Sequence, residues 1–519
     1  MERGLGVGAI LSLVLAYAAL AQGGGWNQNS HYALVRALAD GTPVIDRTRN
    51  DTGTWYVTGD ISAYRGHTYS QKAPGLAFAT FPAYLTMKAA GKAHAVADAT
   101  GQLWFLGLFG VVLPAFVLLY LVRKLANELE PGLGTSAALM LGLGTLMLPF
   151  ATLFFSHVLA ALLGFAVFFV LWYERRGPPR LAYVAVAGVL AGYSVTTEFP
   201  NAMIAAILGL FALARPGRLR RALAFGGGAL AGLAPLLAYD QWAFGSPLHI
   251  SYQSTVGFGT SGSLFFAFPS FRRLVEVLFD PAGVIRTTPV IALAAVGTLL
   301  LYRGGRRFEA LAVTAIAIAF LVLESAYTFP FGGSSPGPRY LIPMLPFLAL
   351  PLATVCRRMP LTTLALAGAS AVEMIAATIT HPIKYSETKA DWFHQLGSGD
   401  FTATALSFFG RLRLDGLELP SSAHWYPLLL FFAPVALALG FAAAERPPLS
   451  LRRQDAFRAG ACLLGWLVIQ QQGPKWLGDS GPVGRQWAPA VVLLLAAALA
   501  TMATTLPYLL TLRDGRSPP

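Results

Sequence analysis

The chain has 519 residues, of which 55% are hydrophobic and only 12% are charged. Soluble domains carry about 25% charged residues, so lipid has to be the solvent for much of this surface. The formal net charge of +13 comes in short Arg and Lys clusters between apolar runs, which is the positive-inside pattern of a polytopic membrane protein. This composition excludes an ordinary soluble enzyme, and the placement of the charges argues against nucleic acid as a partner.

Apolar runs and their flanking charges predict an all-α bundle of about 14 transmembrane helices, the first near residues 5–22. The first run is interpreted as an uncleaved helix, with a cleaved signal peptide as the alternative. Placing the run 76–90 along the outer interface puts nearly every basic cluster, and both termini, on the cytoplasmic side. The other predicted spans lie near residues 103–122, 133–153, 157–173, 181–197, 200–214, 222–239, 286–302, 309–325, 339–355, 361–380, 425–444, 458–470 and 488–511.

The longest predicted outer loop, 23–102, contains a polar stretch at residues 58–75. Within this stretch Asp60 supplies a carboxylate that suits removal of a proton from a hydroxyl, and Lys72 a cation that suits a leaving phosphate. The alternative for this pair is a surface salt bridge. His67 and Tyr69 lie in the same stretch, and we expect them at the same outer cavity.

Further polar residues fall at the predicted outer ends of the spans. Glu198 follows two threonines just before a proline and is the second candidate for a catalytic carboxylate. His157 opens a predicted span, where a capping or hydrogen-bonding role is the alternative to a functional one. Asp60, His157 and Glu198 together would also suit a divalent cation. Asp240 belongs to another outer-face segment and is a further cavity candidate.

A glycine- and proline-rich turn over residues 332–338 leads into Arg339 and Tyr340. Glycines let the backbone approach a ligand, and an arginine can bind a phosphate through two parallel hydrogen bonds. The alternative is a helix-entry turn with an arginine that reaches up to the membrane interface. No Walker, Rossmann or HExxH motif occurs in the sequence, which argues against an ATP-driven transporter.

Several of these blocks resemble bacterial members of the GT-C superfamily of integral-membrane glycosyltransferases, which includes the family 39-like protein O-mannosyltransferases and the aminoarabinose lipid A transferase. The resemblance covers about residues 5–350. It rests on the long first outer loop and on the blocks Tyr-Ser-Gln-Lys-Ala-Pro-Gly (69–75), Thr-Glu-Phe-Pro (197–200), Phe-Gly-Ser-Pro (244–247) and Gly-Pro-Arg-Tyr (337–340). Relatives carry an acidic pair soon after the first span, where this chain has Asn-Gln-Asn-Ser at 27–30.

The resemblance implies a catalytic transmembrane module over residues 1–380, followed by an outer loop and further helices over 381–519. It implies an inverting sugar transfer from a polyprenyl-phosphate-linked donor to a glycan, lipid or protein acceptor at the outer face of a bacterial inner membrane. Lys72 and Arg339 would hold the donor phosphate, and Asp60, with Glu198 second, would be the base. The alternatives are a lipid-linked-sugar flippase, whose paired intramembrane charges or repeats are not evident here, and a non-catalytic subunit of an envelope-assembly complex.

Overall fold

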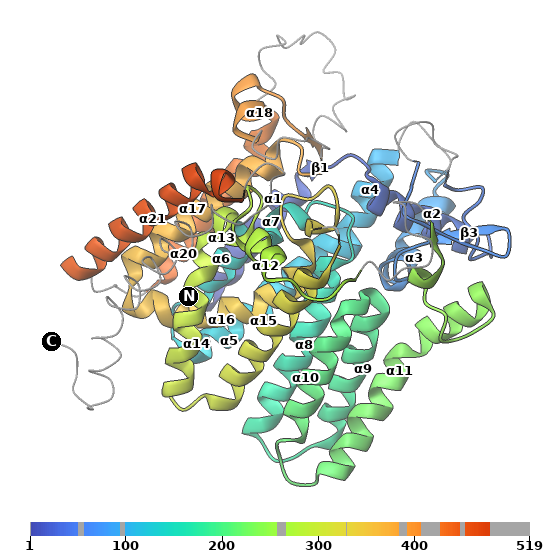
Figure 1. Ribbon diagram of the computed structural model, residues 1–519, viewed down its shortest axis with the longest axis horizontal. Coiled ribbons are helices and arrows are strands. Elements are labelled where there is room, and N and C mark those ends of the chain that lie inside the picture. The colour runs from blue at the N-terminus through green and yellow to red at the C-terminus, as the bar shows by residue number, and fades with distance from the viewer. Residues whose placement is uncertain are drawn as a thin grey trace.

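Most of the described chain is α-helical, as predicted, and two small antiparallel sheets accompany the helices (Figure 1). The computed structural model describes residues 2–49, 57–93, 99–256, 266–328, 330–383, 392–405, 426–446 and 452–477. The first elements are α1 (Glu2–Ala18), β1 (Leu20–Ala21), α2 (Trp26–Ala39), β2 (Ile61–Tyr64), β3 (His67–Ser70), α3 (Gly75–Ala89), α4 (Ala99–Gly107), η2 (Leu108–Val112), α5 (Leu113–Leu129), α6 (Gly134–Leu143), α7 (Met147–Phe150), α8 (His157–Arg176), α9 (Leu181–Thr197), η3 (Phe199–Asn201), α10 (Ala202–Leu213) and α11 (Arg218–Phe244). They are followed by η4 (Ser251–Ser254), β4 (Thr255–Val256), α12 (Phe271–Phe279), α13 (Val284–Thr287), η5 (Pro289–Ala292), α14 (Leu293–Arg303), α15 (Arg307–Ala326), η6 (Pro330–Gly332), η7 (Arg339–Met344), α16 (Leu345–Arg358), α17 (Pro360–Ile379), α18 (Trp392–Ser398), β5 (Ala403–Thr404), η9 (Tyr426–Leu428), α20 (Leu429–Glu445) and α21 (Arg453–Leu477).

Six of the described helices are long and apolar enough to cross a membrane, and a bent pair with 101° between its parts, Phe271–Thr287 and Pro289–Arg303, would make a seventh span. The six are Thr100–Leu129, His157–Arg176, Arg218–Phe244, Arg307–Ala326, Arg339–Arg358 and Pro360–Ile379. Shorter apolar helices accompany them, at Gly4–Ala18, Gly134–Leu143, Leu181–Thr197, Phe199–Leu213 and Leu429–Glu445. The chain is therefore a polytopic helical membrane protein. The total of about 14 spans stays a prediction, and the last predicted span lies outside the described residues.

The predicted spans agree with the observed helices where the apolar run stays helical throughout. The predicted span 181–197 has the bounds of α9. The predicted span 133–153 is instead interrupted after α6, where the hydroxyl of Thr145 accepts a hydrogen bond from the backbone N–H of Met147 at 3.1 Å. The predicted span 286–302 is broken at Pro289, which cannot donate the backbone hydrogen bond that a continuous helix needs.

Helices α9 and α11 lie side by side (Figure 1) and pack through glycines that face each other. A Cβ atom added at Gly192 would lie 2.1 Å from the carbonyl oxygen of Ala229, and one at Gly232 would lie 2.1 Å from that of Val189. Such contacts are possible only without side chains, and small residues are the usual means by which apolar helices bring their backbones together. The α9–α11 pair therefore depends on its glycines.

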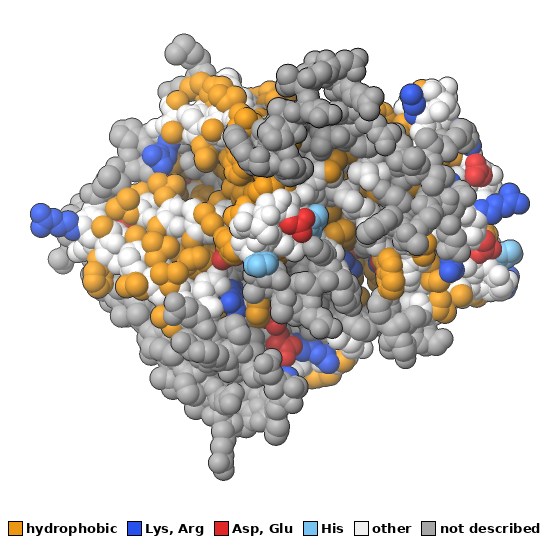
Figure 2. Space-filling model, turned by 90° about the horizontal axis from the view of Figure 1, so that it is seen from above, with side chains coloured by type: hydrophobic (Ala, Val, Ile, Leu, Met, Phe, Trp, Pro, Cys, Tyr) orange, Lys and Arg blue, Asp and Glu red, His pale blue; other side chains and the backbone are white. Residues whose placement is uncertain are grey.

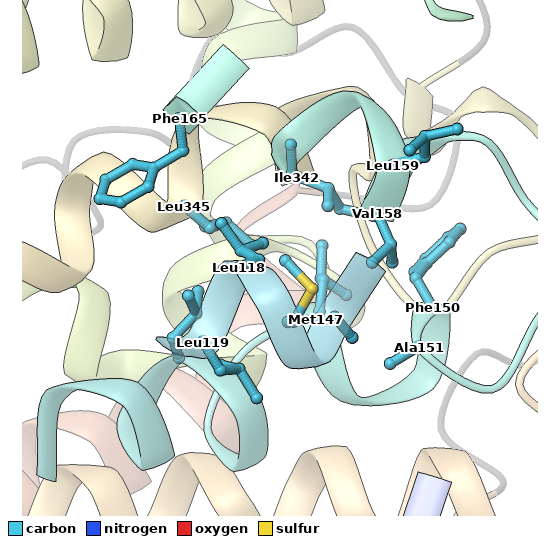
Figure 3. Close-up of a cluster of buried hydrophobic side chains, with 14 of the residues drawn as sticks. Leu118, Leu119, Met147, Phe150, Ala151, Val158, Leu159, Phe165, Ile342 and Leu345 are labelled. Carbon is cyan, nitrogen blue, oxygen red and sulfur yellow. The ribbon is translucent and has the colours of Figure 1, made fainter. Parts of the chain in front are cut away.

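The core lies where α5, α7, α8, η7 and α16 meet. Figure 3 shows buried side chains from these helices in contact, among them Leu118, Leu119, Met147, Phe150, Val158, Phe165, Ile342 and Leu345. Helix α8 packs directly against η7, the segment that begins at Arg339. The core thus fixes the start of η7 relative to the start of α8. Each of these two starts carries a candidate site residue, Arg339 on η7 and His157 on α8.

The polar stretch 58–75 is not an irregular loop but contains the hairpin β2–β3, whose register pairs Ile61 with Ser70. Arg65 and Gly66 form its turn with φ angles of 48° and 81°, the left-handed conformation that tight hairpin turns require. Strand β4 pairs with the other edge of β2. Helix α3 agrees with the predicted helix at 76–90 and packs against α2; its position along the outer interface stays a prediction.

The surface reflects the same division between apolar helices and a polar first loop. Figure 2 shows many hydrophobic side chains on the face seen from above, while charged side chains are sparse. Several charged side chains gather at the right-hand edge of this view, the side on which α2 and β3 lie in Figure 1.

Candidate active site

A cavity of about 560 Å³ lies between the start of α2, the hairpin, the start of α8 and the segment before η7. This volume is in the range of small-molecule binding sites. Four of the sequence-predicted site residues line it: Asp60, Lys72, Arg339 and Tyr340. The other described residues of its lining are Gly25, Trp26, Asn27, Gln71, Phe155, Tyr327, Gly332, Gly333, Ser334 and Ile383.

Asp60 and Lys72 form an ion pair with 2.8 Å between Oδ2 and Nζ, and their side chains are only 12% and 8% exposed. The hairpin produces this contact, because Asp60 precedes β2 and Lys72 follows β3. The backbone N–H of Gln71 donates to the carbonyl of Asp60 at 3.2 Å, and the hydroxyl of Ser30 donates to the same carbonyl at 2.7 Å. The pair is a salt bridge, but a buried one at a cavity and not a surface pair.

Arg339 is 6% exposed, so its side chain is enclosed by protein. Its guanidinium lies 5.5 Å from the ring centroids of both Phe155 and Tyr340. Gly332 makes room for it, since a Cβ atom there would lie 2.5 Å from Arg339 Nε, and Gly332 has a φ of +71° that favours glycine. Among the described residues no carboxylate lies within salt-bridge distance of Arg339, and its Nε has no hydrogen-bond partner. A buried arginine of this kind is suited to bind an anion.

Behind the cavity, a buried hydrogen-bonded network joins α2, the start of α8 and the end of α9. The Ser156 hydroxyl donates to Glu198 Oε1, and Nδ1 of His157 lies 3.2 Å from the same oxygen. Nε2 of His31 lies 3.4 Å from Ser156 Oγ. Because the hydroxyl proton of Ser156 points to Glu198, its oxygen is left to accept a hydrogen bond from the Nε2–H of His31.

Burial and the nearby positive charges of Lys72 and Arg339 lower the pKa of His31 from 6.5 to about 3. Burial raises the pKa of Glu198 above its ordinary value, while the Ser156 hydrogen bond and the charges of Lys72 and Arg339 act in the opposite direction. His31 is therefore neutral at physiological pH, and Glu198 lies within electrostatic reach of both cations.

Three predicted cavity residues are placed elsewhere. His67 lies near the tip of the hairpin with its side chain 57% exposed, and its Nδ1 is 3.0 Å from Asp46 Oδ2. Tyr69 is buried against Phe244, with 5.0 Å between ring centroids. Asp240 is buried in α11. His67 and Tyr69 are two residues apart on β3 and therefore lie on the same face of that strand, whereas Asp240 lies on a helix, and none of the three lines the cavity.

The three residues that were predicted to suit a divalent cation are Asp60, His157 and Glu198. They do not form a cation site in the part of the chain that the structure describes. Asp60 is paired with Lys72, whereas Glu198 is bonded to Ser156 and His157. No group of three or more His, Cys, Asp or Glu side chains among the described residues is arranged to hold a metal ion.

Sequence reasoning did not assign roles to three residues of this region, Trp26, Asn27 and His31. All three lie in the first two turns of α2. The available signal was the run of polar residues 27–31 directly after an apolar span. This run departs from the acidic pair of relatives, and burial of amide and imidazole groups next to lipid indicates a site.

Neither a protein-family model nor a curated protein sequence matches this chain. Among solved structures it is similar to ArnT from Cupriavidus metallidurans bound to undecaprenyl phosphate, with 17% identity, 91% of this chain and 76% of that chain covered, and a TM-score of 0.47. It is also similar to the oligosaccharyltransferase AglB from Archaeoglobus fulgidus in complex with an inhibitory peptide and a dolichol-phosphate, with 13% identity and a TM-score of 0.42. That second match covers 93% of this chain and 61% of AglB. Both are GT-C membrane glycosyltransferases, the superfamily that the sequence resembles.

Proposed function

We propose that this chain is an integral-membrane glycosyltransferase of the GT-C type, which transfers a sugar from a polyprenyl-phosphate-linked donor to an acceptor. The observation that carries the proposal is the buried group of Lys72, Arg339 and Asp60 on the wall of one cavity in an apolar helical bundle. Two buried cations suit a phosphate, and the surrounding apolar helices suit its lipid chain.

In the proposed reaction the donor phosphate binds between Lys72 and Arg339. An acceptor hydroxyl attacks the anomeric carbon from the face opposite the phosphate, and the bond from that carbon to the phosphate oxygen breaks. The hydroxyl proton passes to a carboxylate, and polyprenyl phosphate leaves with its negative charge held by the two cations. The product has inverted configuration because there is a single displacement.

Asp60 is the proposed base, and its contact with Lys72 gives it a defined position at the cavity. When a phosphate shares Lys72, the carboxylate loses part of its ion pair and becomes a better proton acceptor. Glu198 is the second candidate, because it lies within electrostatic reach of Lys72 and Arg339. The proposal places the cavity at the outer face of a bacterial inner membrane, both termini in the cytoplasm, and a glycan, lipid or protein as acceptor.

The direct test is a transfer assay with the full chain reconstituted in liposomes and supplied with labelled polyprenyl-phosphate sugars. Release of polyprenyl phosphate with label in an acceptor is the expected result, and it should be lost in Lys72→Ala. Lys88→Ala is the matched control, since Lys88 pairs with Asp40 at 2.9 Å on the exposed side of the same loop. Movement of the label across the bilayer without transfer would instead identify a flippase. If the label is neither transferred nor moved, both functions are overturned.

A further inference from the structure

The start of α2 contributes two residues to the cavity beside the charged group. Trp26 is 52% exposed, and its indole lies over Gly59, where a Cβ atom would be 2.6 Å from an indole carbon. The hydroxyl of Thr58 donates to the Trp26 carbonyl at 2.7 Å and accepts from the N–H of Asp60 at 3.1 Å. One threonine thus holds the aromatic residue and the proposed base in a fixed relation.

Asn27 lies next to Trp26 and also lines the cavity. It is only 7% exposed, and its Oδ1 atom has no hydrogen-bond partner in the part of the chain that the structure describes. A buried amide oxygen without a partner is costly, so its presence at a cavity wall points to a ligand that supplies a donor. A sugar hydroxyl is such a donor, and it can also accept from the amide N–H₂.

The charges of the lining decide which sugar fits. The described lining has three charged side chains, Asp60, Lys72 and Arg339. Asp60 is the one carboxylate of the described lining, and in the proposed reaction it faces the acceptor hydroxyl once the phosphate shares Lys72 and Arg339. No further carboxylate among the described lining residues is available to pair with an ammonium group. A cationic amino sugar would therefore either pair with the proposed base or be buried without a counter-charge, and both are unfavourable for transfer.

We infer that Trp26 and Asn27 form the glycosyl subsite of this cavity and that they select an uncharged sugar. This inference rests on the proposed function and adds the class of the transferred group. The C–H bonds of the sugar ring pack on the electron-rich indole, and the Asn27 amide binds ring hydroxyls. The phosphate lies toward Lys72 and Arg339, so the anomeric carbon is directed to Asp60.

The test measures equilibrium binding of three probes to the full chain in nanodiscs: polyprenyl phosphate, the same lipid carrying a neutral hexose, and the same lipid carrying an amino sugar. The hexosyl donor should bind more tightly than the amino-sugar donor. Asn27→Ala should weaken the hexosyl donor about tenfold and leave polyprenyl phosphate within about twofold. Asn27→Asp should reverse the preference in favour of the amino sugar. Gln253→Ala, at an exposed amide outside the cavity, is the control.

Oδ1 of Asn27 makes no hydrogen bond with a described residue, so loss of folding is not expected in Asn27→Ala. Trp26→Ala provides an independent variant and should weaken the hexosyl donor more than polyprenyl phosphate. Equal binding of both sugar donors, or equal weakening of all three probes by Asn27→Ala, would overturn the inference. In either case, binding of polyprenyl phosphate by the wild-type protein would leave the proposed function intact. If wild-type protein binds none of the three probes, the proposed function and this subsite fail together.

Discussion

Lys72 Nζ and Asp60 Oδ2 are 2.8 Å apart in a buried ion pair that the hairpin β2–β3 closes. Removal of one partner of such a pair leaves a buried charge without compensation, at a cost of about 3 kcal/mol or more. We therefore expect Asp60→Ala to lower the melting temperature in detergent more than the double variant Asp60→Ala/Lys72→Ala does. If the double variant is less stable than Asp60→Ala, the buried charge of Lys72 is not compensated by Asp60 as the structure shows.

The two cations of the cavity should determine donor affinity. Lys72→Ala removes a charged hydrogen-bond donor and should raise the dissociation constant of polyprenyl phosphate about tenfold to a hundredfold. Arg339→Ala should have an effect of the same order, because no described carboxylate forms a salt bridge with Arg339. Fluorescence or filter-binding titration with polyprenyl phosphate measures both. Lys88→Ala is the control, and unchanged affinity in the Lys72 and Arg339 variants would refute the phosphate role.

The base can be identified by separating catalysis from binding. Asp60→Asn keeps the size of the side chain but removes its proton affinity, so we expect kcat to fall by about 10²-fold to 10⁴-fold with donor affinity retained. Asp40→Asn, the exposed partner of Lys88, serves as the matched control. Glu198→Gln should lower kcat by less. A fully active Asp60→Asn protein together with an inactive Glu198→Gln protein would move the role of base to Glu198.

The glycine contact between α9 and α11 gives a prediction on stability alone. Gly192→Leu places a side chain where a Cβ atom is already 2.1 Å from the Ala229 carbonyl oxygen. The helices would have to separate, and we expect a clear fall in melting temperature and in the yield of folded protein. Gly226→Leu on α11 is a suitable control because its added Cβ meets no atom within 4 Å. Equal stability of the two variants would contradict the close packing.

Apolar runs of this chain were sufficient to predict helices such as α9, whose bounds equal the predicted ones. They were insufficient where the backbone leaves the helix inside protein, as after α6, because a buried break is as apolar in sequence as a helix. Residue chemistry likewise predicted the types of group at the cavity, with Lys72 and Arg339 on its wall. It could not show that the first turns of α2 are buried beside them, so Asn27 and His31 received no role.

The buried imidazole of His31 makes stability depend on pH in a defined direction. Burial and the charges of Lys72 and Arg339 lower its pKa from 6.5 to about 3. Between about pH 3 and pH 6.5, His31 is thus neutral in the folded protein, while in the unfolded chain it binds a proton. The free energy that His31 contributes to folding is fully present above pH 6.5 and is lost as the pH falls toward 3, by at most about 1.4 kcal/mol per pH unit. His31→Gln removes this pH-dependent contribution to the folding free energy. Thermal unfolding at pH 7.5 and pH 4.5 should therefore show a smaller loss of stability in His31→Gln than in wild type, and an equal or larger loss would show that His31 is protonated in the folded protein.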